Sequence, residues 1–151
     1  NGKYMLAHVA AMEGVAAAEN IMGQGRVMDY SAVPQCIYTF PEVAAVGITE
    51  EEAMSQGLQF KVSRFPVKAN GKSLADGNRD GFIKLLADEA GRILGAHILA
   101  PHAAEMITQC SLAMGLKATA EDIGRIIFPH PTVSEIISEA AHGITGRAIN
   151  G

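Results

Sequence analysis

The sequence of 151 residues predicts an α+β fold, with an antiparallel sheet of about four to five strands flanked by helices. Short runs rich in β-branched and aromatic residues dominate residues 36–99, which is typical of strands. Apolar residues at helical spacing dominate residues 103–143. Strands followed by helices favour one antiparallel sheet covered by helices, because each element must bury its apolar face against another.

The N-terminal part of the chain is predicted to be a separate helix. Residues 4–22 are rich in Ala, Met and Glu, and a glycine follows them, as glycine often does at a helix end. Residues 26–35 show no clear hydrophobic period and contain a proline, so we expect a connector there. We therefore divide the chain into a helical remnant of a preceding domain, residues 1–25, and a second domain, residues 26–151.

Five short apolar runs are the candidate strands of the sheet. Pro66 places the third run at a sheet edge, because proline cannot donate to a strand ladder. The slip in its alternation near Ser63 indicates either a bulge or this same edge position. A four-residue link with a glycine predicts that the last two runs form a hairpin. The runs cover residues 36–40, 43–48, 60–67, 81–87 and 92–99.

Helices and one loop account for the rest of the second domain. Thr49 and Glu52 fit a capping box, which predicts a short helix that ends at Gly57. Residues 70–80 are polar and glycine-containing, and we expect an exposed loop without a function. Three more helices are predicted. One covers residues 103–115 and one covers residues 133–143. The helix between them starts at Thr119 and is expected to have Ile123, Ile126 and Ile127 on its inner face.

Composition and charge argue against several classes of protein. The net charge is −4 and no run of Lys or Arg is present, so nucleic-acid binding has no electrostatic support. The apolar stretches fall short of the roughly 20 residues that a membrane helix needs. Cys36 and Cys110 fit no zinc pattern and no disulfide framework, so we expect two free thiols in a cytoplasmic protein, with a bridge between them left open. His97 and His102 lack the neighbours of a metal ligand, so no metal site is expected.

The segment around His130 carries the most chemical information. Pro129 and Pro131 leave the backbone of His130 little freedom. Thr132 and Glu135 have the spacing of another capping box, so His130 is expected on a rigid loop just before a helix. A general base needs such fixed placement, and a carboxylate near one imidazole nitrogen would set its tautomer. The alternative is a surface or packing histidine, with Glu135 acting only as a cap.

Four segments in consistent order resemble the pyridine nucleotide-disulfide oxidoreductases. Residues 128–135 match the His-Pro-Thr-x-x-Glu signature of that family. The last helix and the short tail, which ends at Ile149, Asn150 and Gly151, resemble the lipoamide dehydrogenases within it. The end of the family's FAD domain is resembled by residues 5–8 with Glu13 and Gly14. The opening of its interface domain is resembled by residues 38–50, and the central hairpin of that domain by residues 81–84 and 93–99.

The resemblance implies roles for individual residues. His130 would be the acid–base residue, paired with Glu135, and would reach across a homodimer interface to the redox disulfide of the other subunit. His130 and Pro131 would lie near the flavin of that subunit, and the peptide bond before Pro131 would be cis. Electrons would pass from dihydrolipoamide through FAD to NAD. The partners would be lipoyl-bearing proteins of 2-oxo acid dehydrogenase or glycine cleavage complexes. The rim of the FAD site would be Met5, Leu6, Ala7 and His8.

Missing motifs limit what this chain is expected to do alone. No GxGxxG follows a strand and the CxxxxC redox pair is absent, so we expect no FAD binding and no turnover from the chain by itself. The start at Asn1, without an initiator Met or a signal-peptide pattern, indicates a piece of a longer protein. Two alternatives remain: the same domain from a glutathione reductase-like or other NAD(P)H disulfide reductase, and a dimerisation module without a catalytic residue.

Overall fold

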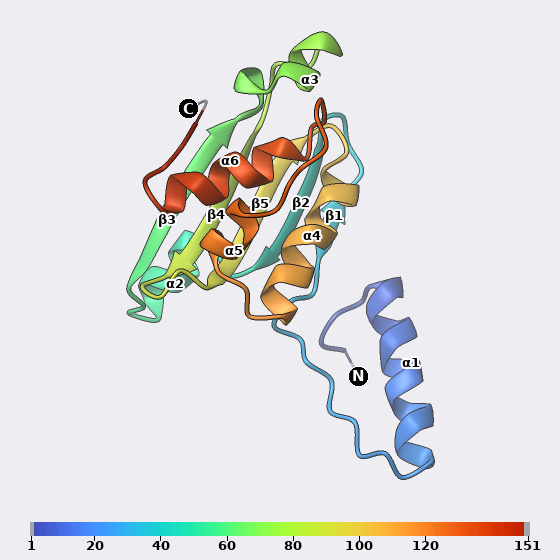
Figure 1. The fold of residues 1–151 in the computed structure, drawn as a ribbon. Helices are drawn as coiled ribbons and strands as arrows, with labels where there is room; N and C mark the ends of the chain where they lie inside the picture. The colour runs from blue at the N-terminus through green and yellow to red at the C-terminus, as the bar shows by residue number, and fades with distance from the viewer. Residues whose placement is uncertain (1, 150–151) are drawn as a thin grey trace.

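The computed structural model describes residues 2–149 and confirms the predicted α+β fold (Figure 1). Its five strands are all antiparallel and follow the order β1-β2-β5-β4-β3. β4 and β5 form the predicted hairpin, and β3 lies at a sheet edge, as Pro66 indicates. Asn150 and Gly151 of the predicted tail lie outside the described residues. The strands are β1 (Gln35–Ile37), β2 (Glu42–Gly47), β3 (Phe60–Pro66), β4 (Phe82–Asp88) and β5 (Ile93–Ala100).

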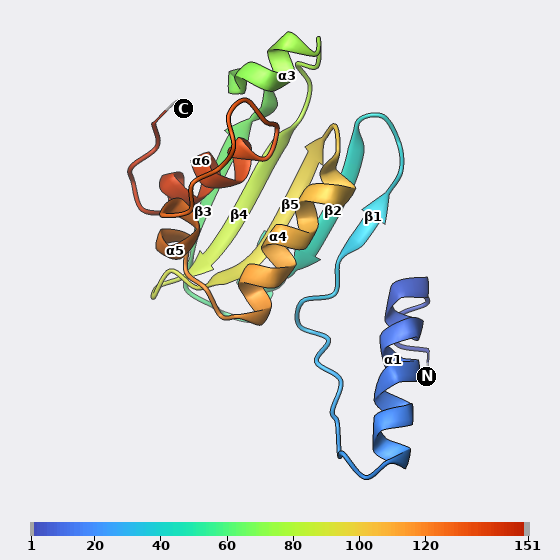
Figure 2. The same cartoon turned by 45° about the vertical axis from the view of Figure 1, so that its right-hand side comes forward.

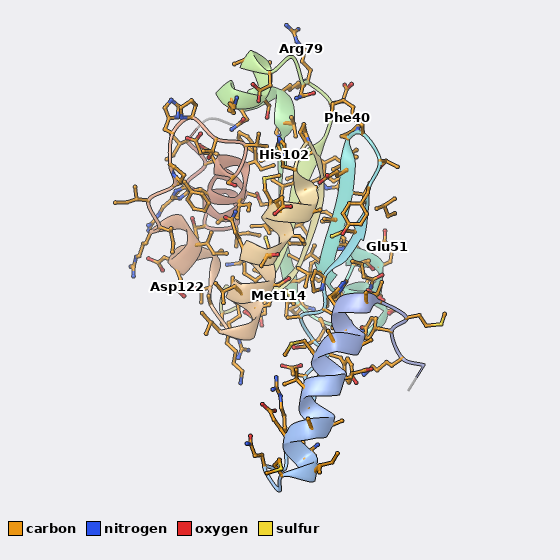
Figure 3. All side chains as sticks on the ribbon, turned by 90° about the vertical axis from the view of Figure 1, so that its right-hand side faces the viewer. Phe40, Glu51, Arg79, His102, Met114 and Asp122 are labelled. Carbon is orange, nitrogen blue, oxygen red and sulfur yellow. The ribbon has the colours of Figure 1, made fainter. Side chains whose placement is uncertain are left out.

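Three helices cover one face of this sheet (Figures 1 and 2). Helix α4 (Ala103–Gly115) packs on β2 and β5, helix α6 (Glu135–Ile144) packs on β3 and β4, and helix α5 (Ala120–Gly124) contacts α6. Figure 3 shows α4 running from His102 at one end to Met114 near the other. Within residues 2–149, no helix has both the length and the apolar character needed to cross a membrane.

The apolar core lies between the sheet and helices α4 and α6. Ile83 and Leu85 of β4 point into it and are fully buried. Lys84, between them, points to the opposite face, because side chains alternate along a strand. There its Nζ donates to the carboxylate of Glu50 in helix α2 (Glu50–Ser55) at 2.6 Å. The helices contribute Met106, Ile107, Cys110, Ile136, Ile137, Ala140 and Ala141 to the core.

Helix α1 (Ala7–Ile21) lies beside the sheet rather than on it in both views (Figures 1 and 2). It packs against the connector that follows it. The hydroxyl of Tyr30 donates to Glu13 at 2.7 Å, and the Tyr30 ring stacks on Tyr4 with 5.8 Å between centroids. The helix begins later than predicted because the residues before Ala7 fold back against this connector.

One expectation about the strands is wrong in detail, and one of the two alternatives for β3 is excluded in favour of the edge position. β1 ends at Ile37, because the next residues turn back toward β2 and leave Tyr38 and Phe40 exposed. β3 has no bulge at Ser63: its pairing with β4 is continuous from Phe60 to Pro66, and the register shift in the sheet falls between β4 and β5. The slip in alternation arises because β3 carries apolar side chains on both of its faces.

The helical segments also differ from the expectations at two places. Residues 70–80 are not a plain exposed loop, since helix α3 (Gly71–Ala75) lies within them, directly after the 3-10 turn η1 (Val67–Ala69), and Asn70 is buried. Helix α5 ends at Gly124, so Ile126 and Ile127 are 61% and 95% exposed instead of lining its inner face. The capping box of Thr49 and Glu52 is confirmed.

Gly95 sits where the sheet leaves no room for a side chain. A Cβ atom at this position would lie 2.2 Å from the backbone oxygen of Ile48. We expect Gly95→Ala to destabilise the domain by about 3 kcal/mol or more, because the backbone of Ile48 cannot rotate away as a side chain could. Urea unfolding measures the change. Gly115→Ala is the control: open space surrounds Gly115, so this variant should be as stable as the parent or slightly more so.

Glu50 is predicted to contribute pH-dependent stability. Its carboxylate accepts from Lys84 Nζ at 2.6 Å and from Arg64 at 2.7 Å, and these hydrogen bonds, Lys84 first, hold its pKa below the ordinary value of 4.5. A lowered folded-state pKa gives stability that is complete above the unfolded value and is lost as pH falls through the folded value.

We therefore expect Glu50→Gln to lower the free energy of unfolding by about 1 kcal/mol at pH 7, since the pair is only partly shielded from water. This difference from the parent should shrink steadily below pH 4.5. Urea unfolding across this range tests it, with Glu121→Gln as a control, because the Glu121–Arg125 pair is well exposed. A difference that is constant with pH would contradict the prediction.

Candidate active site

His130 lies on a loop of residues 125–134, called the His130 loop below, which joins α5 to α6. The loop rises to the end of the sheet where α3 lies (Figures 1 and 2). The peptide bond between His130 and Pro131 is cis, as the family resemblance implies. The hydroxyl of Thr132 donates to the carbonyl of Pro129 at 2.8 Å and closes the turn around His130. Proline residues on both sides and this hydrogen bond fix the backbone from which the imidazole projects.

The structure brings His130 and Glu135 together. Imidazole Nδ1 lies 2.9 Å from Glu135 Oε1, and the other carboxylate oxygen, Oε2, accepts the backbone N–H of Thr132 at 2.8 Å. Both oxygens of Glu135 therefore have a defined partner, and the carboxylate orientation is fixed. The His130 side chain is 78% exposed, so its remaining nitrogen, Nε2, is accessible from outside the chain.

The predicted capping box of Thr132 and Glu135 is only half formed. Glu135 reaches back to the N–H of Thr132, as a capping box requires. The Thr132 hydroxyl, however, donates to Pro129 rather than accepting from the N–H of Glu135. Helix α6 starts at Glu135, with Ser134 at the N-cap position and no side-chain cap. The hydroxyl thus stabilises the His130 loop instead of the helix, which is a correction to the expected cap.

The charge state of Glu135 follows from these contacts. Partial burial acts to raise the pKa of Glu135, but the Thr132 N–H and the His130 ring outweigh it, and the pKa lies below its ordinary value. Its place in the first turn of α6 also favours an anion. An ionised carboxylate can only accept, so His130 Nδ1 must donate and Nε2 is left as the acceptor. The pair can therefore take up a proton at Nε2.

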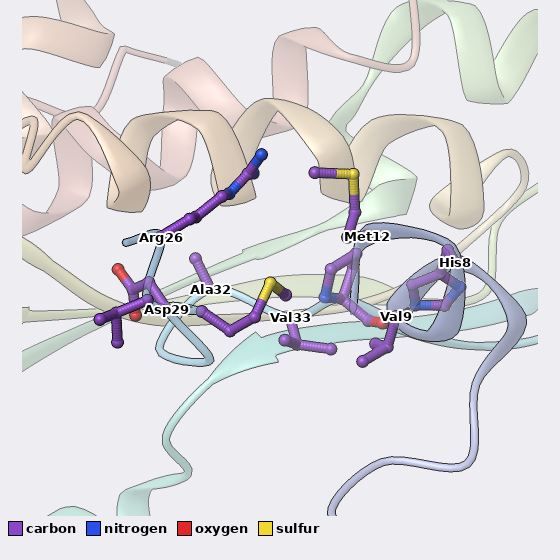
Figure 4. A pocket seen from close by; sticks show the side chains of 10 residues that line it. His8, Val9, Met12, Arg26, Asp29, Ala32 and Val33 are labelled. Carbon is purple, nitrogen blue, oxygen red and sulfur yellow. Dashed lines mark hydrogen bonds between the residues drawn. The ribbon is translucent and has the colours of Figure 1, made fainter. Parts of the chain in front are cut away.

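The residues predicted for the FAD rim lie elsewhere, at the start of α1. Met5 is 95% exposed, Leu6 occupies the N-cap position of α1 without a side-chain cap, and Ala7 begins the helix. His8 Nε2 lies 3.0 Å from the carbonyl of Pro34. A hollow of about 310 Å³ separates this end of α1 from the connector, with His8, Val9 and Met12 along its edge (Figure 4). The structure does not bring these residues near His130 (Figures 1 and 2).

Asn70 is the residue near the site that the sequence reasoning missed. Its amide Nδ2 donates to the carbonyl of Thr132 at 3.0 Å, and its Oδ1 accepts the N–H of Ser73 at 2.8 Å. The spacing of Asn70 and Ser73 is that of a helix N-cap, and this signal could have predicted α3. Nothing in the local sequence indicates the contact with Thr132, which lies 62 residues away.

The other reactive side chains have structural environments. Burial, followed by the charge of Lys84, lowers the pKa of His97, whose Nδ1 has no hydrogen-bond partner in the described part of the chain. Cys36 and Cys110 are free thiols, and burial raises the pKa of Cys110 to about 12, which makes it unreactive. No cluster of three or more His, Cys, Asp or Glu suited to a metal occurs among the described residues.

Comparison with known proteins identifies the family. Residues 33–141 match the family described as pyridine nucleotide-disulphide oxidoreductase, dimerisation domain. The chain is 49% identical over 147 residues to dihydrolipoyl dehydrogenase of Cupriavidus necator and 46% identical over 151 residues to that of Bacillus subtilis. These matches cover 97% and 99% of this chain but only 31% and 32% of the relatives, so the chain spans about a third of their length.

Solved structures agree with this assignment. LpdA from Mycobacterium tuberculosis superposes with a TM-score of 0.89 at 28% identity, over 95% of this chain and 32% of that protein. The HOCl-induced flavoprotein disulfide reductase RclA from Escherichia coli superposes with a TM-score of 0.87 at 25% identity, over 93% of this chain and 33% of RclA. The chain therefore belongs to the pyridine nucleotide-disulphide oxidoreductase family, and residues 33–141 form its dimerisation domain.

Proposed function

We propose that the whole protein is a dihydrolipoyl dehydrogenase, which oxidises dihydrolipoamide with NAD⁺, and that this chain supplies its acid–base pair. The observation that carries the proposal is the fixed contact between His130 Nδ1 and Glu135, which leaves Nε2 free to accept a proton. Relatives of the same name that match nearly the whole chain at 46–49% identity support the choice within the family.

His130 and Glu135 have distinct parts in the proposed reaction. His130 Nε2 takes the proton from one thiol of dihydrolipoamide, because the thiolate is the competent nucleophile. This thiolate attacks one sulfur of the redox disulfide of the partner subunit and displaces the other sulfur as a thiolate. Glu135 stabilises the imidazolium that forms and keeps Nδ1 protonated throughout. Pro131 fixes the ring beside the flavin of the same partner subunit.

Part of the proposed FAD site falls within this chain. At the start of α1, backbone N–H groups have no side-chain cap and the apolar side chain of Met5 is exposed. Both features suit a flavin ring, which has an apolar face and polar edge atoms. Met5, Leu6, Ala7 and His8 would therefore hold one edge of the cofactor. When bound, FAD accepts two electrons from the dithiol and passes them to NAD⁺ as a hydride.

The proposed homodimer has a suitable surface close to the active-site loop. Leu112 of α4, its C-cap residue Leu116 and Ile126 of the His130 loop line an apolar groove of about 300 Å³, and Ile127, next to Ile126 in the chain, is almost fully exposed. An apolar patch of this kind on a domain of a dimerising family favours a second copy of the chain as its occupant. Two residues that line the groove, Ile126 and Phe128, lie within four positions of His130 in the chain. This closeness is expected if His130 reaches into the partner subunit.

The domain division, compartment and partners complete the proposal. Residues 1–25 would close the FAD-binding domain and residues 26–151 would form the interface domain, which is consistent with a family match that starts at residue 33. Two unbridged thiols favour the reducing environment of the cytoplasm. The dihydrolipoamide substrate would be presented by lipoyl-bearing proteins of 2-oxo acid dehydrogenase or glycine cleavage complexes.

The first test is His130→Gln in the full-length protein. We expect kcat for dihydrolipoamide oxidation to fall by about 10²- to 10⁴-fold, because glutamine cannot take up the proton. Flavin content, measured by absorbance, should not change. His102→Asn is the matched control, since His102 belongs neither to the acid–base pair nor to the proposed FAD rim, is exposed and has a left-handed backbone that asparagine tolerates. Normal turnover by His130→Gln would mean that the domain only dimerises.

The second test concerns the proposed dimer surface. Leu116→Glu combined with Ile126→Glu places two carboxylates in the apolar groove, and we expect the dimer Kd to rise by about 100-fold or more, because burying like charges is unfavourable. Turnover of the dithiol should fall together with the dimer fraction seen in sedimentation. Met54→Glu, an equally exposed apolar site on α2, is the control. A stable dimer in the double variant would place the interface elsewhere.

A further inference from the structure

Asn70 is a buried polar residue whose side-chain oxygen and nitrogen are both hydrogen-bonded. It is 5% exposed, and together with Ser73 it makes up the buried polar residues of the described chain. Oδ1 accepts both the N–H and the hydroxyl of Ser73, at 2.8 and 2.9 Å. Nδ2 donates to the carbonyl of Thr132 at 3.0 Å. One amide group thus joins the start of α3 to the His130 loop.

These contacts extend without a break to the imidazole. The carbonyl of Thr132 is held by Asn70, its N–H is held by Glu135, and its hydroxyl is held by Pro129. Glu135 in turn holds Nδ1 of His130 at 2.9 Å. Thr132 is therefore held at both of its peptide groups: Glu135 holds the N–H of the peptide before its Cα, and Asn70 holds the carbonyl of the peptide after it. Loss of the bond to Asn70 would release the second peptide and with it one restraint on the φ and ψ angles of Thr132.

We propose that Asn70 is a positioning residue for the acid–base pair. It holds the carbonyl of Thr132 and so maintains the hydrogen-bonding geometry between Glu135 and His130. The inference rests on the proposed function of His130 and Glu135. Asn70 does not touch substrate in this role; it fixes the backbone on which the base is mounted.

The amide nitrogen separates this role from simple helix capping. Capping of α3 needs only Oδ1, and Asp or Ser would cap as well as Asn. The bond to Thr132 needs a donor at Nδ2, which neither an ionised Asp nor the shorter Ser can supply. A residue kept only as a cap would not need its second polar atom, whereas here that atom is buried and directed at the His130 loop.

The test uses Asn70→Asp and Asn70→Ser in the full-length, flavin-loaded enzyme. We expect kcat for dihydrolipoamide oxidation to fall by about 10- to 100-fold in both variants, as is common when a supporting hydrogen bond to an active-site group is lost. Electron transfer from NADH to a quinone acceptor should be unchanged, because that reaction needs no proton from a dithiol. Thr49→Ala is the matched control, since it removes an equivalent helix cap on the far side of the sheet.

The pH dependence of kcat distinguishes loss of the Asn70–Thr132 hydrogen bond from a general loss of stability. The new carboxyl group of Asn70→Asp can donate to the Thr132 carbonyl only when it is protonated, and the protonated fraction grows as pH falls. The ratio of its kcat to that of the parent should therefore rise as pH falls, while the ratio for Asn70→Ser stays flat.

The outcomes separate this inference from the proposed function. If His130→Gln abolishes dithiol turnover but both Asn70 variants behave like Thr49→Ala, Asn70 is only a structural residue and the inference fails. If His130→Gln retains turnover, the proposed function itself fails. Should Asn70→Asp not fold, Asn70→Ser decides the matter, because it introduces no buried charge.

Discussion

The site depends on one carboxylate that is held at both of its oxygens. Glu135 accepts from the Thr132 N–H and from His130 Nδ1, so a single side chain sets the position of the loop and of the ring. Its own position is set by helix α6, whose next two residues, Ile136 and Ile137, are buried against the sheet. Burial of two such side chains stabilises the helix by several kcal/mol, on the order of 2 kcal/mol each. The geometry of the His130–Glu135 pair thus rests on hydrophobic packing, and hydrogen bonds extend it to the imidazole.

Loop residues normally gain mobility from solvent exposure, and the proposed function requires the His130 loop to be exposed. The structure combines a fixed backbone with an imidazole that is held at Nδ1 and exposed at its other edge. Thr132 is bonded through its carbonyl, N–H and hydroxyl, whereas the imidazole is mostly exposed. This arrangement reduces the conformational entropy that would otherwise be lost when the ring engages a substrate.

Much of the fold could be predicted because its signals are local. The glycine link between β4 and β5, the capping box at Thr49 and the periodicity of α4 each involve neighbours in sequence, and all three were correct. The pairing of His130 with Glu135, five positions apart, was implied by the family resemblance, since the local sequence left open whether Glu135 was only a helix cap. Asn70 was missed because its partner lies 62 residues away, and no pattern of neighbours encodes such a contact. Ile126 was misplaced because helical periodicity continues past Gly124 in the sequence, while the helix does not.

The early end of α5 at Gly124 places two apolar residues, Ile126 and Ile127, on the surface instead of in the core. Inside a helix, Ile126 and Ile127 would have been core residues; on the His130 loop they are exposed, four and three positions from His130. Leaving two isoleucines in water is unfavourable, so the free chain has a driving force to cover them. A partner that covers them also restrains the loop that carries His130. Under the proposed function, dimer formation and placement of His130 would therefore be physically coupled, because one short segment carries both the apolar contact surface and the imidazole.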